Sequence, residues 1–151
     1  MKRFHFPLRS VETVRSMLEM RAREAFTKAL HLFNDAEKQL ELVCAQRRKL
    51  EEIMLASRNA TLRPPDQVAY MRAYQGELLR ERETKKKRDD AKAELDKRRE
   101  EWVASRRDLR VIENLEVNAR QAYRREFERE EQKILDDRTN ATAGRAPLLM
   151  S

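Results

Sequence analysis

The chain has 151 residues, of which 40% are charged, two are glycine and four are proline. This composition excludes an ordinary compact globule, because turns are scarce and there are too few apolar residues for a thick core. Glu, Lys, Arg, Ala and Leu are abundant, which is typical of long helices and coiled coils. The net charge of +7 arises from 34 bases and 27 acids mixed along the chain, so it permits acidic partners without requiring nucleic acid.

The first predicted element is a helix over residues 8–57, which Ser10 can cap, with Pro7 as an alternative first-turn residue. Apolar residues recur along it at steps of three and four, the pattern of a coiled-coil seam. The seam residues expected from this pattern are Val11, Val14, Leu18, Ala22, Ala25, Ala29, Leu32, Ala36, Leu40, Val43, Leu50 and Ile53, widened by Phe26, Phe33 and Met54.

A turn over residues 58–66 is predicted to follow. The adjacent prolines Pro64 and Pro65 forbid continuation of the first helix, and Asp66 can cap the next one. Outside this break, Gly76 is the one glycine or proline within residues 8–137. The chain is therefore expected to fold back once, as a helical hairpin.

The second predicted helix spans residues 67–137 and contains the strongly charged tract 80–102. Leu95, Trp102 and Leu109 follow one another at heptad steps. We expect an all-α fold: a single antiparallel coiled-coil hairpin over residues 1–137, with the second helix longer and overhanging. Residues 138–151 are expected to form a flexible C-terminal tail.

Equal rise along two antiparallel helices predicts that facing residues have numbers summing to about 123. The charged tract then faces an alanine-lined stretch of the first helix and should be loosely packed. Beyond about residue 115 the second helix lacks an intramolecular partner, yet an apolar stripe continues through Ala119, Tyr123, Phe127 and Ile134. A partner protein is the favoured cover for this stripe. Self-association remains an alternative, as does fraying of this end or its packing by Phe4 and Phe6.

The residues predict no catalytic, cofactor or metal site. Gly76 and Gly144 stand alone, so no phosphate-binding loop is encoded, and His5, His31 and Cys44 lack the spacing of zinc ligands. The basic block 85–88 is framed by acids, which argues against nucleic acid. No apolar run is long enough for membrane insertion. The single cysteine fits a reducing compartment, so the cytoplasm is expected.

The opening FHFPLRSVETVR, with Phe4, Phe6, Leu8, Val11 and Arg15, and the later segment WVASRRDLRVIENL resemble the flagellar export protein FliJ family. The resemblance covers roughly residues 1–137. It implies a non-enzymatic stalk, similar to the central coiled coil of the rotary ATPase γ subunit, at the inner face of the cell membrane at the flagellar base. The implied partners are the hexameric flagellar export ATPase, the cytoplasmic domain of the export gate protein, and export chaperones.

Two sets of binding residues follow as hypotheses. The gate-facing positions that match the family are Gln39, Val43, Gln46, Leu50, Tyr74 and Leu78. The overhang and its surroundings suggest the following contacts to the ATPase ring: Arg9, Arg15, Arg120, Tyr123, Arg124, Arg125, Phe127 and Ile134. The alternatives to this function are a structural coiled coil that self-associates and the injectisome counterpart of the stalk.

Overall fold

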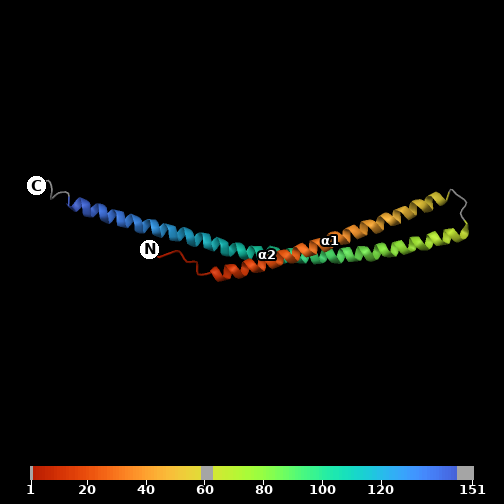
Figure 1. Cartoon of the computed structure of the whole chain (residues 1–151), viewed down its shortest axis with the longest axis horizontal. Coiled ribbons are helices and arrows are strands. Elements are labelled where there is room, and N and C mark those ends of the chain that lie inside the picture. The colour runs from red at the N-terminus through yellow and green to blue at the C-terminus, as the bar shows by residue number, and fades with distance from the viewer. Residues whose placement is uncertain (1, 59–62, 146–151) are drawn as a thin grey trace. The chain divides into compact units, whose positions relative to one another are not determined.

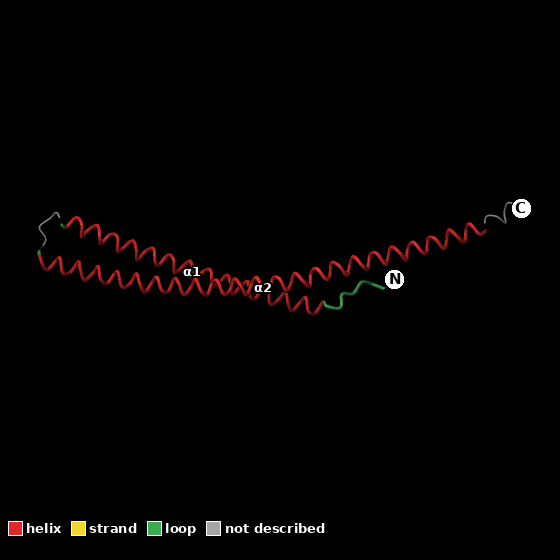
Figure 2. Tube along the Cα trace, turned by 180° about the vertical axis from the view of Figure 1, so that it is seen from behind, coloured by secondary structure: helices red, strands yellow, loops and turns green. Residues whose placement is uncertain are grey.

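The structure, a computed structural model, describes residues 2–58 and 63–145. This part of the chain contains two α-helices, α1 over Arg9–Ser57 and α2 over Pro64–Arg145, and no strand (Figures 1 and 2). The helices are 49 and 82 residues long and pack against each other. The predicted all-α class with a longer second helix is therefore confirmed.

Helix α1 begins one residue later than expected. The amide of Glu12 donates to the carbonyl of Leu8 at 3.0 Å, so Leu8 occupies the N-cap position. The amide of Arg9 also donates to the carbonyl of Phe6 at 3.2 Å. The prediction that Ser10 caps this helix is wrong, because Ser10 already lies inside the first turn.

Helix α2 begins earlier than expected, at Pro64. The amides of Asp66 and Gln67 donate to the carbonyl of Arg63 at 3.0 and 3.3 Å, so Arg63 precedes the first turn and Asp66 is not the cap. Prolines are tolerated here because the first amides of a helix have no intrahelical acceptor. The break is therefore shorter than the predicted turn over 58–66, of which residues 59–62 lie outside the described residues.

Helix α2 also ends later than the expected residue 137. It continues to Arg145, and the hydroxyls of Thr139 and Thr142 donate to carbonyls four residues earlier at 2.8 Å. No proline stands between residues 138 and 145 to stop the helix. The expected flexible tail is thus helical up to Arg145, and residues 146–151 lie outside the described part of the chain.

The chain divides into two compact units, and each unit contains part of α1 and part of α2. We call residues 19–105 the turn unit, since they include the connection between the helices. The other unit comprises residues 1–18 and 106–151, and we call it the terminal unit.

In the turn unit the two helices run antiparallel (Figure 1). Side-chain hydrogen bonds join Trp102 to Glu19, Glu81 to Cys44 and Tyr74 to Glu51. Facing residues therefore have numbers that sum to between 121 and 125, which brackets the expected 123, as equal rise along the two helices requires.

Each helix has a seam of buried or half-buried residues at alternating steps of three and four, the spacing of a coiled coil. On α1 the seam consists of Glu12, Arg15, Glu19, Ala22, Phe26, Ala29, Phe33, Ala36, Leu40, Val43, Arg47, Leu50, Met54 and Ser57. On α2 it consists of Tyr74, Glu77, Glu81, Thr84, Arg88, Ala91, Leu95, Arg98, Trp102, Ser105, Leu109, Ile112, Glu116, Ala119 and Tyr123.

The observed seam of α1 corrects part of the predicted one. Three of its members, Phe26, Phe33 and Met54, were expected only to widen the seam, and others are charged. A coiled-coil seam must keep one register along the helix. A seam that includes Phe26 and Phe33 therefore leaves several residues of the predicted seam outside the observed one. The exposed ones are Val11 at 36%, Val14 at 56%, Leu18 at 51%, Leu32 at 64% and Ile53 at 47%.

The charged tract is held by a thin core. Leu95 and Ala29 are each 5% exposed, and Arg88 and Arg98 take seam positions. At the end of the tract, Trp102 stacks on Phe26 with ring centroids 5.2 Å apart. The core here combines a few large apolar side chains with small or charged neighbours, and the arginine stems cover part of the seam.

Candidate interaction surfaces

The N-terminal segment, residues 2–8, packs on α2 within the terminal unit. The hydroxyl of Tyr123 donates to the carbonyl of Lys2 at 2.9 Å, and the ring of Phe4 meets that of Tyr123 edge-on at 5.4 Å. Phe6 is only 4% exposed. Packing by the N-terminal phenylalanines therefore covers Tyr123, which was one of the three alternatives for the apolar stripe.

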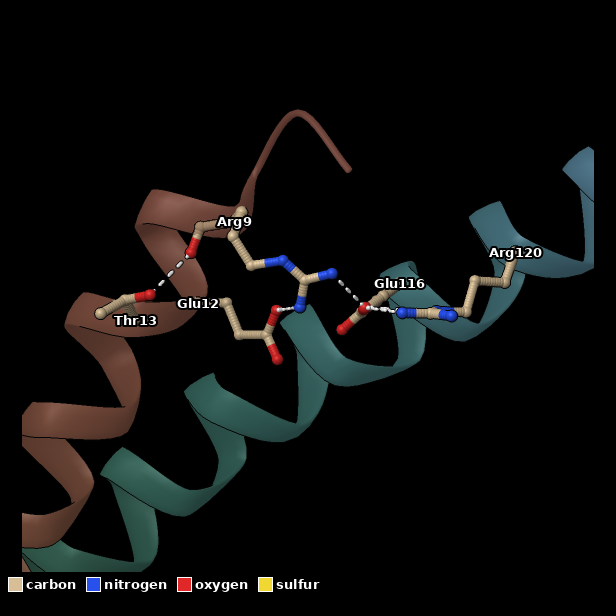
Figure 3. A network of polar contacts seen from close by, with 5 residues as sticks. All are labelled: Arg9, Glu12, Thr13, Glu116 and Arg120. Carbon is tan, nitrogen blue, oxygen red and sulfur yellow. Dashed lines mark hydrogen bonds and ion pairs between the residues drawn. The ribbon is translucent and has the colours of Figure 1, made fainter. Parts of the chain in front are cut away.

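A charge network joins the start of α1 to α2 (Figure 3). Arg9 forms ion pairs with Glu12 at 3.0 Å and with Glu116 at 2.7 Å, and Arg120 reaches Glu116 at 3.1 Å. Partial desolvation of the Glu116 carboxyl opposes ionisation, but the hydrogen bonds from Arg9 and Arg120 outweigh it and lower the pKa of Glu116. Two arginines of the predicted ring-binding set thus pair with Glu116 within the terminal unit, Arg9 across the helices and Arg120 along α2.

Arg15, another member of that set, lies in the seam. Its guanidinium donates to the backbone carbonyl of Asp108 at 2.9 Å. Arg120 also lies 5.0 Å above the centroid of the Phe4 ring. The structure therefore engages these arginines in contacts within the chain.

The rest of the predicted ring-binding set lies beyond Tyr123. Every described residue from 124 to 145 is exposed, including Arg124 and Arg125. Phe127 stacks on Tyr123 at 6.4 Å and is 39% exposed, whereas Ile134 is 54% exposed. These four side chains are the accessible members of the set.

The predicted gate-binding set divides in a similar way within the turn unit. Val43 is 5% exposed, and Leu50, Tyr74 and Leu78 are half-buried. Gln39 and Gln46 are exposed. Four of the six positions therefore support the helix pair, and the two glutamines remain on its surface.

An exposed side chain that the sequence reasoning missed lies between these glutamines. Leu42 is 58% exposed. Gln39, Leu42 and Gln46 each come one residue before a seam position, so helical geometry places all three on one side of α1. Their spacing of three and four was visible in the sequence, but it becomes informative only once the seam is known.

A polar network occupies the seam beneath the gate-binding set. The Tyr74 hydroxyl donates to Glu51 at 2.9 Å, Arg47 reaches the same carboxylate at 2.7 Å, and Arg47 also pairs with Glu81. The hydrogen bond from Tyr74 lowers the pKa of Glu51 and raises that of Tyr74. Arg47, which interrupts the apolar pattern of the first helix, was the sequence signal for this network.

Cys44 borders the same network. Its thiol lies 3.5 Å from a carboxylate oxygen of Glu81, and burial together with this acceptor raises the pKa of Cys44.

Between the end of α1 and the start of α2, a surface hollow of about 350 Å³ is lined by Glu51, Met54, Leu55, Arg58, Met71 and Tyr74. Methionines in such a hollow adapt readily to different partner side chains.

In the part of the chain that the structure describes, no group of three or more His, Cys, Asp or Glu side chains is placed to hold a metal ion. Neither α1 nor α2, over the residues described, has a stretch apolar enough to cross a bilayer. The surfaces that do stand out carry exposed apolar, amide and arginine side chains, which suits contacts with proteins.

The sequence model of the family described as "Flagellar FliJ protein" matches residues 4–147, which is nearly the whole chain. No curated protein and no solved structure matches the chain. The extent of the family match agrees with the resemblance carried by the N-terminal residues and the long second helix. The chain therefore belongs to the flagellar FliJ protein family and is a component of flagellar protein export.

Proposed function

We propose that the chain is the stalk of the flagellar export ATPase complex. In this role it binds the hexameric export ATPase, connects it to the cytoplasmic domain of the export gate protein, and escorts export chaperones. It would work at the inner face of the cell membrane, at the flagellar base. The observation that carries the proposal is the family match over residues 4–147.

The contact with the ATPase ring is assigned to the exposed end of α2. Arg124 and Arg125 can pair with acidic loops of the ring, and Phe127 and Ile134 offer apolar side chains beside them. A lone helix that exposes apolar residues gains stability when a partner buries them. Arg9 and Arg15 contribute indirectly, because their contacts join α1 to α2 in the terminal unit. Arg120 contributes through its pair with Glu116, the partner of Arg9.

The contact with the export gate is assigned to the exposed line of Gln39, Leu42 and Gln46. The two amides can donate and accept hydrogen bonds, and Leu42 can fill an apolar pocket of the partner. Val43 and Leu50 lie in the seam next to this line and fix its position. The matched family is described as flagellar, which favours the flagellar system over the injectisome counterpart.

The ring contact is tested by measuring the ATPase rate and the co-migration of the cognate export ATPase with the full chain. We expect stimulation and co-migration, and we expect both to be lost with Phe127→Asp and Ile134→Asp. These side chains are exposed, so circular dichroism should show unchanged helicity. If the wild-type chain neither stimulates the ATPase nor co-migrates with it, the proposal fails.

The gate contact is tested by titrating the cytoplasmic domain of the gate protein with the same chain. Leu42→Asp should abolish binding, while Ile134→Asp should leave it intact. In the ATPase assay the two variants should behave in the opposite way, so each one controls for the other. Loss of both activities in either variant would contradict the assignment of separate surfaces.

A further inference from the structure

The terminal unit exposes a group of aliphatic side chains that the proposed contacts with ATPase and gate do not use. All are at least one third exposed, although the sequence pattern had placed three of them in the seam. We call the group the lateral apolar face. Its members are Val11 at 36%, Val14 at 56%, Leu18 at 51%, Val111 at 54% and Leu115 at 44% exposure.

These residues lie on one side of the helix pair. Each of them comes one residue before a seam position: Val11 precedes Glu12, for example, and Val111 precedes Ile112. In two antiparallel helices that share a seam, residues displaced from it by the same step fall on the same side of both helices. The face therefore combines side chains of α1 and α2.

The face is almost free of charge. The other residues that precede a seam position on α2 in this unit are Asp108, Asn118 and Ala122, so Asp108 is the one charged residue among them. The opposite side of α2 differs sharply, because charged residues predominate among those that follow a seam position. Five of the six residues that follow a seam position are charged, namely Arg106, Arg110, Glu113, Arg120 and Arg124, and the sixth is Val117.

The seam of the terminal unit buries little apolar surface by itself. Phe6 and Ile112 are the core residues among its described residues, and Glu12, Arg15 and Glu116 occupy seam positions. A pair of helices normally buries its apolar side against a further layer. Within the described chain no third helix exists to supply that layer.

We propose that the lateral apolar face pairs with the same face of a second copy of this chain. A charged partner surface would be desolvated here without a counter-charge, so the fitting surface is apolar and uncharged. The same face on another copy has these properties, and a two-fold axis makes such contacts self-complementary. The two helix pairs then form two layers with the arginine-rich sides outward.

This inference does not rest on the proposed function. Because the arginine-rich sides stay outward, Arg124 remains accessible to an acidic partner in the paired state. The pair is thus the expected state of the chain when it is free of the export apparatus.

The proposal is tested by measuring the molecular mass of the full chain in solution by sedimentation over a wide range of protein concentrations. We expect reversible formation of a dimer, with a dissociation constant raised about tenfold or more by Val111→Glu or Val14→Glu. Val117→Glu and Met17→Glu are matched controls in the same helices, since Val117 is 52% and Met17 50% exposed and both lie off the face. They should change the dissociation constant less than about twofold.

A cross-linking measurement locates the contact independently of stability. In a Cys44→Ser background, Val14→Cys and Val111→Cys are oxidised separately and as an equal mixture, with Val117→Cys as the control. A disulfide-linked dimer should form in at least one of the first three samples and not in the control. The mixture is included because α1 can stack on either helix of the second copy.

Three outcomes would overturn the proposal: a monomer at every concentration, equal weakening by Val111→Glu and Val117→Glu, or equal cross-linking of Val117→Cys. If the chain stays monomeric and Val111→Glu weakens binding to the export ATPase, the face belongs to that partner instead. Absence of any ATPase effect, with the dimer intact, would refute the proposed function and leave this inference standing.

Discussion

Replacing Leu95 by alanine tests whether the charged tract over residues 80–102 is held by an apolar core. Leu95 is 5% exposed and takes a seam position on α2 in the turn unit. The facing stretch of α1 contains Ala29, which is equally buried. Leu95 is thus one of few large apolar side chains in this part of the seam, and its removal should be felt along the tract.

The expected loss follows from the carbon atoms removed. Leucine loses three carbons on conversion to alanine, which corresponds to about 2.4 kcal/mol of transfer free energy at about 0.8 kcal/mol per methylene. A seam between two helices is open at its sides, so water can enter and the cavity adds little. Alanine also favours the helix slightly more than leucine. We therefore expect a loss of about 2 kcal/mol, or about 4–8 °C in the melting temperature.

The assay is thermal and urea unfolding followed by circular dichroism, with the fluorescence of the single tryptophan, Trp102, as a second probe. Leu79→Ala is the matched control, because Leu79 lies on the same helix and is 57% exposed. It should change the free energy of unfolding by less than about 0.5 kcal/mol. Equal losses for the two variants would refute the view that Leu95 anchors the tract.

Three further predictions concern the seam, the charge network and the N-terminal segment. Phe33→Ala should destabilise the chain by roughly 2 kcal/mol and Leu32→Ala by less than about 0.5 kcal/mol, because Phe33 lies in the seam and Leu32 is 64% exposed; urea unfolding with the reverse order would contradict the assigned seam. The pKa of Glu116 is lowered by folding, so the stability that it contributes is present above its unfolded pKa and is lost as pH falls through its lowered folded pKa. Unfolding measured between neutral and acidic pH should show a shallower loss for Glu116→Gln. Tyr123→Phe removes the hydrogen bond to Lys2 and should increase amide hydrogen exchange in residues 2–8, and unchanged exchange would mean that ring packing alone holds this segment.

The sequence predicted the helices because their signals are local. Alternating steps of three and four, the pair Pro64–Pro65 and the scarcity of glycine act within a few residues of where they occur. The ends were less accurate, since prolines are compatible with the first turn of a helix and no strong stop signal precedes Arg145. The heptad spacing of Leu95, Trp102 and Leu109 was read correctly, and all three lie in the observed seam.

The binding surfaces depended on information that is not local. On α1, apolar residues form two neighbouring stripes, and either could have faced α2. Phe26 and Phe33 lie on the stripe that was selected, so Val14 and Leu32 became exposed. The register is a joint property of both helices, because each layer must fit along the whole seam. Val14 and Leu32, which were predicted to lie in the core, are therefore on the surface. The predicted gate-binding set is likewise divided between seam residues and surface residues.

The sequence alone determined that this chain forms two long helices of unequal length, folded back at a single break, and its N-terminal and second-helix residues pointed to the FliJ family. Only the tertiary structure decided which stripe of α1 is buried, that residues 2–8 cover Tyr123, and that Gln39 and Gln46 stay exposed. The physical reason is that helix formation follows from the periodicity of one segment. Burial, in contrast, follows from the fit between segments distant in sequence, and a non-helical segment such as residues 2–8 has no periodicity that could reveal its contact.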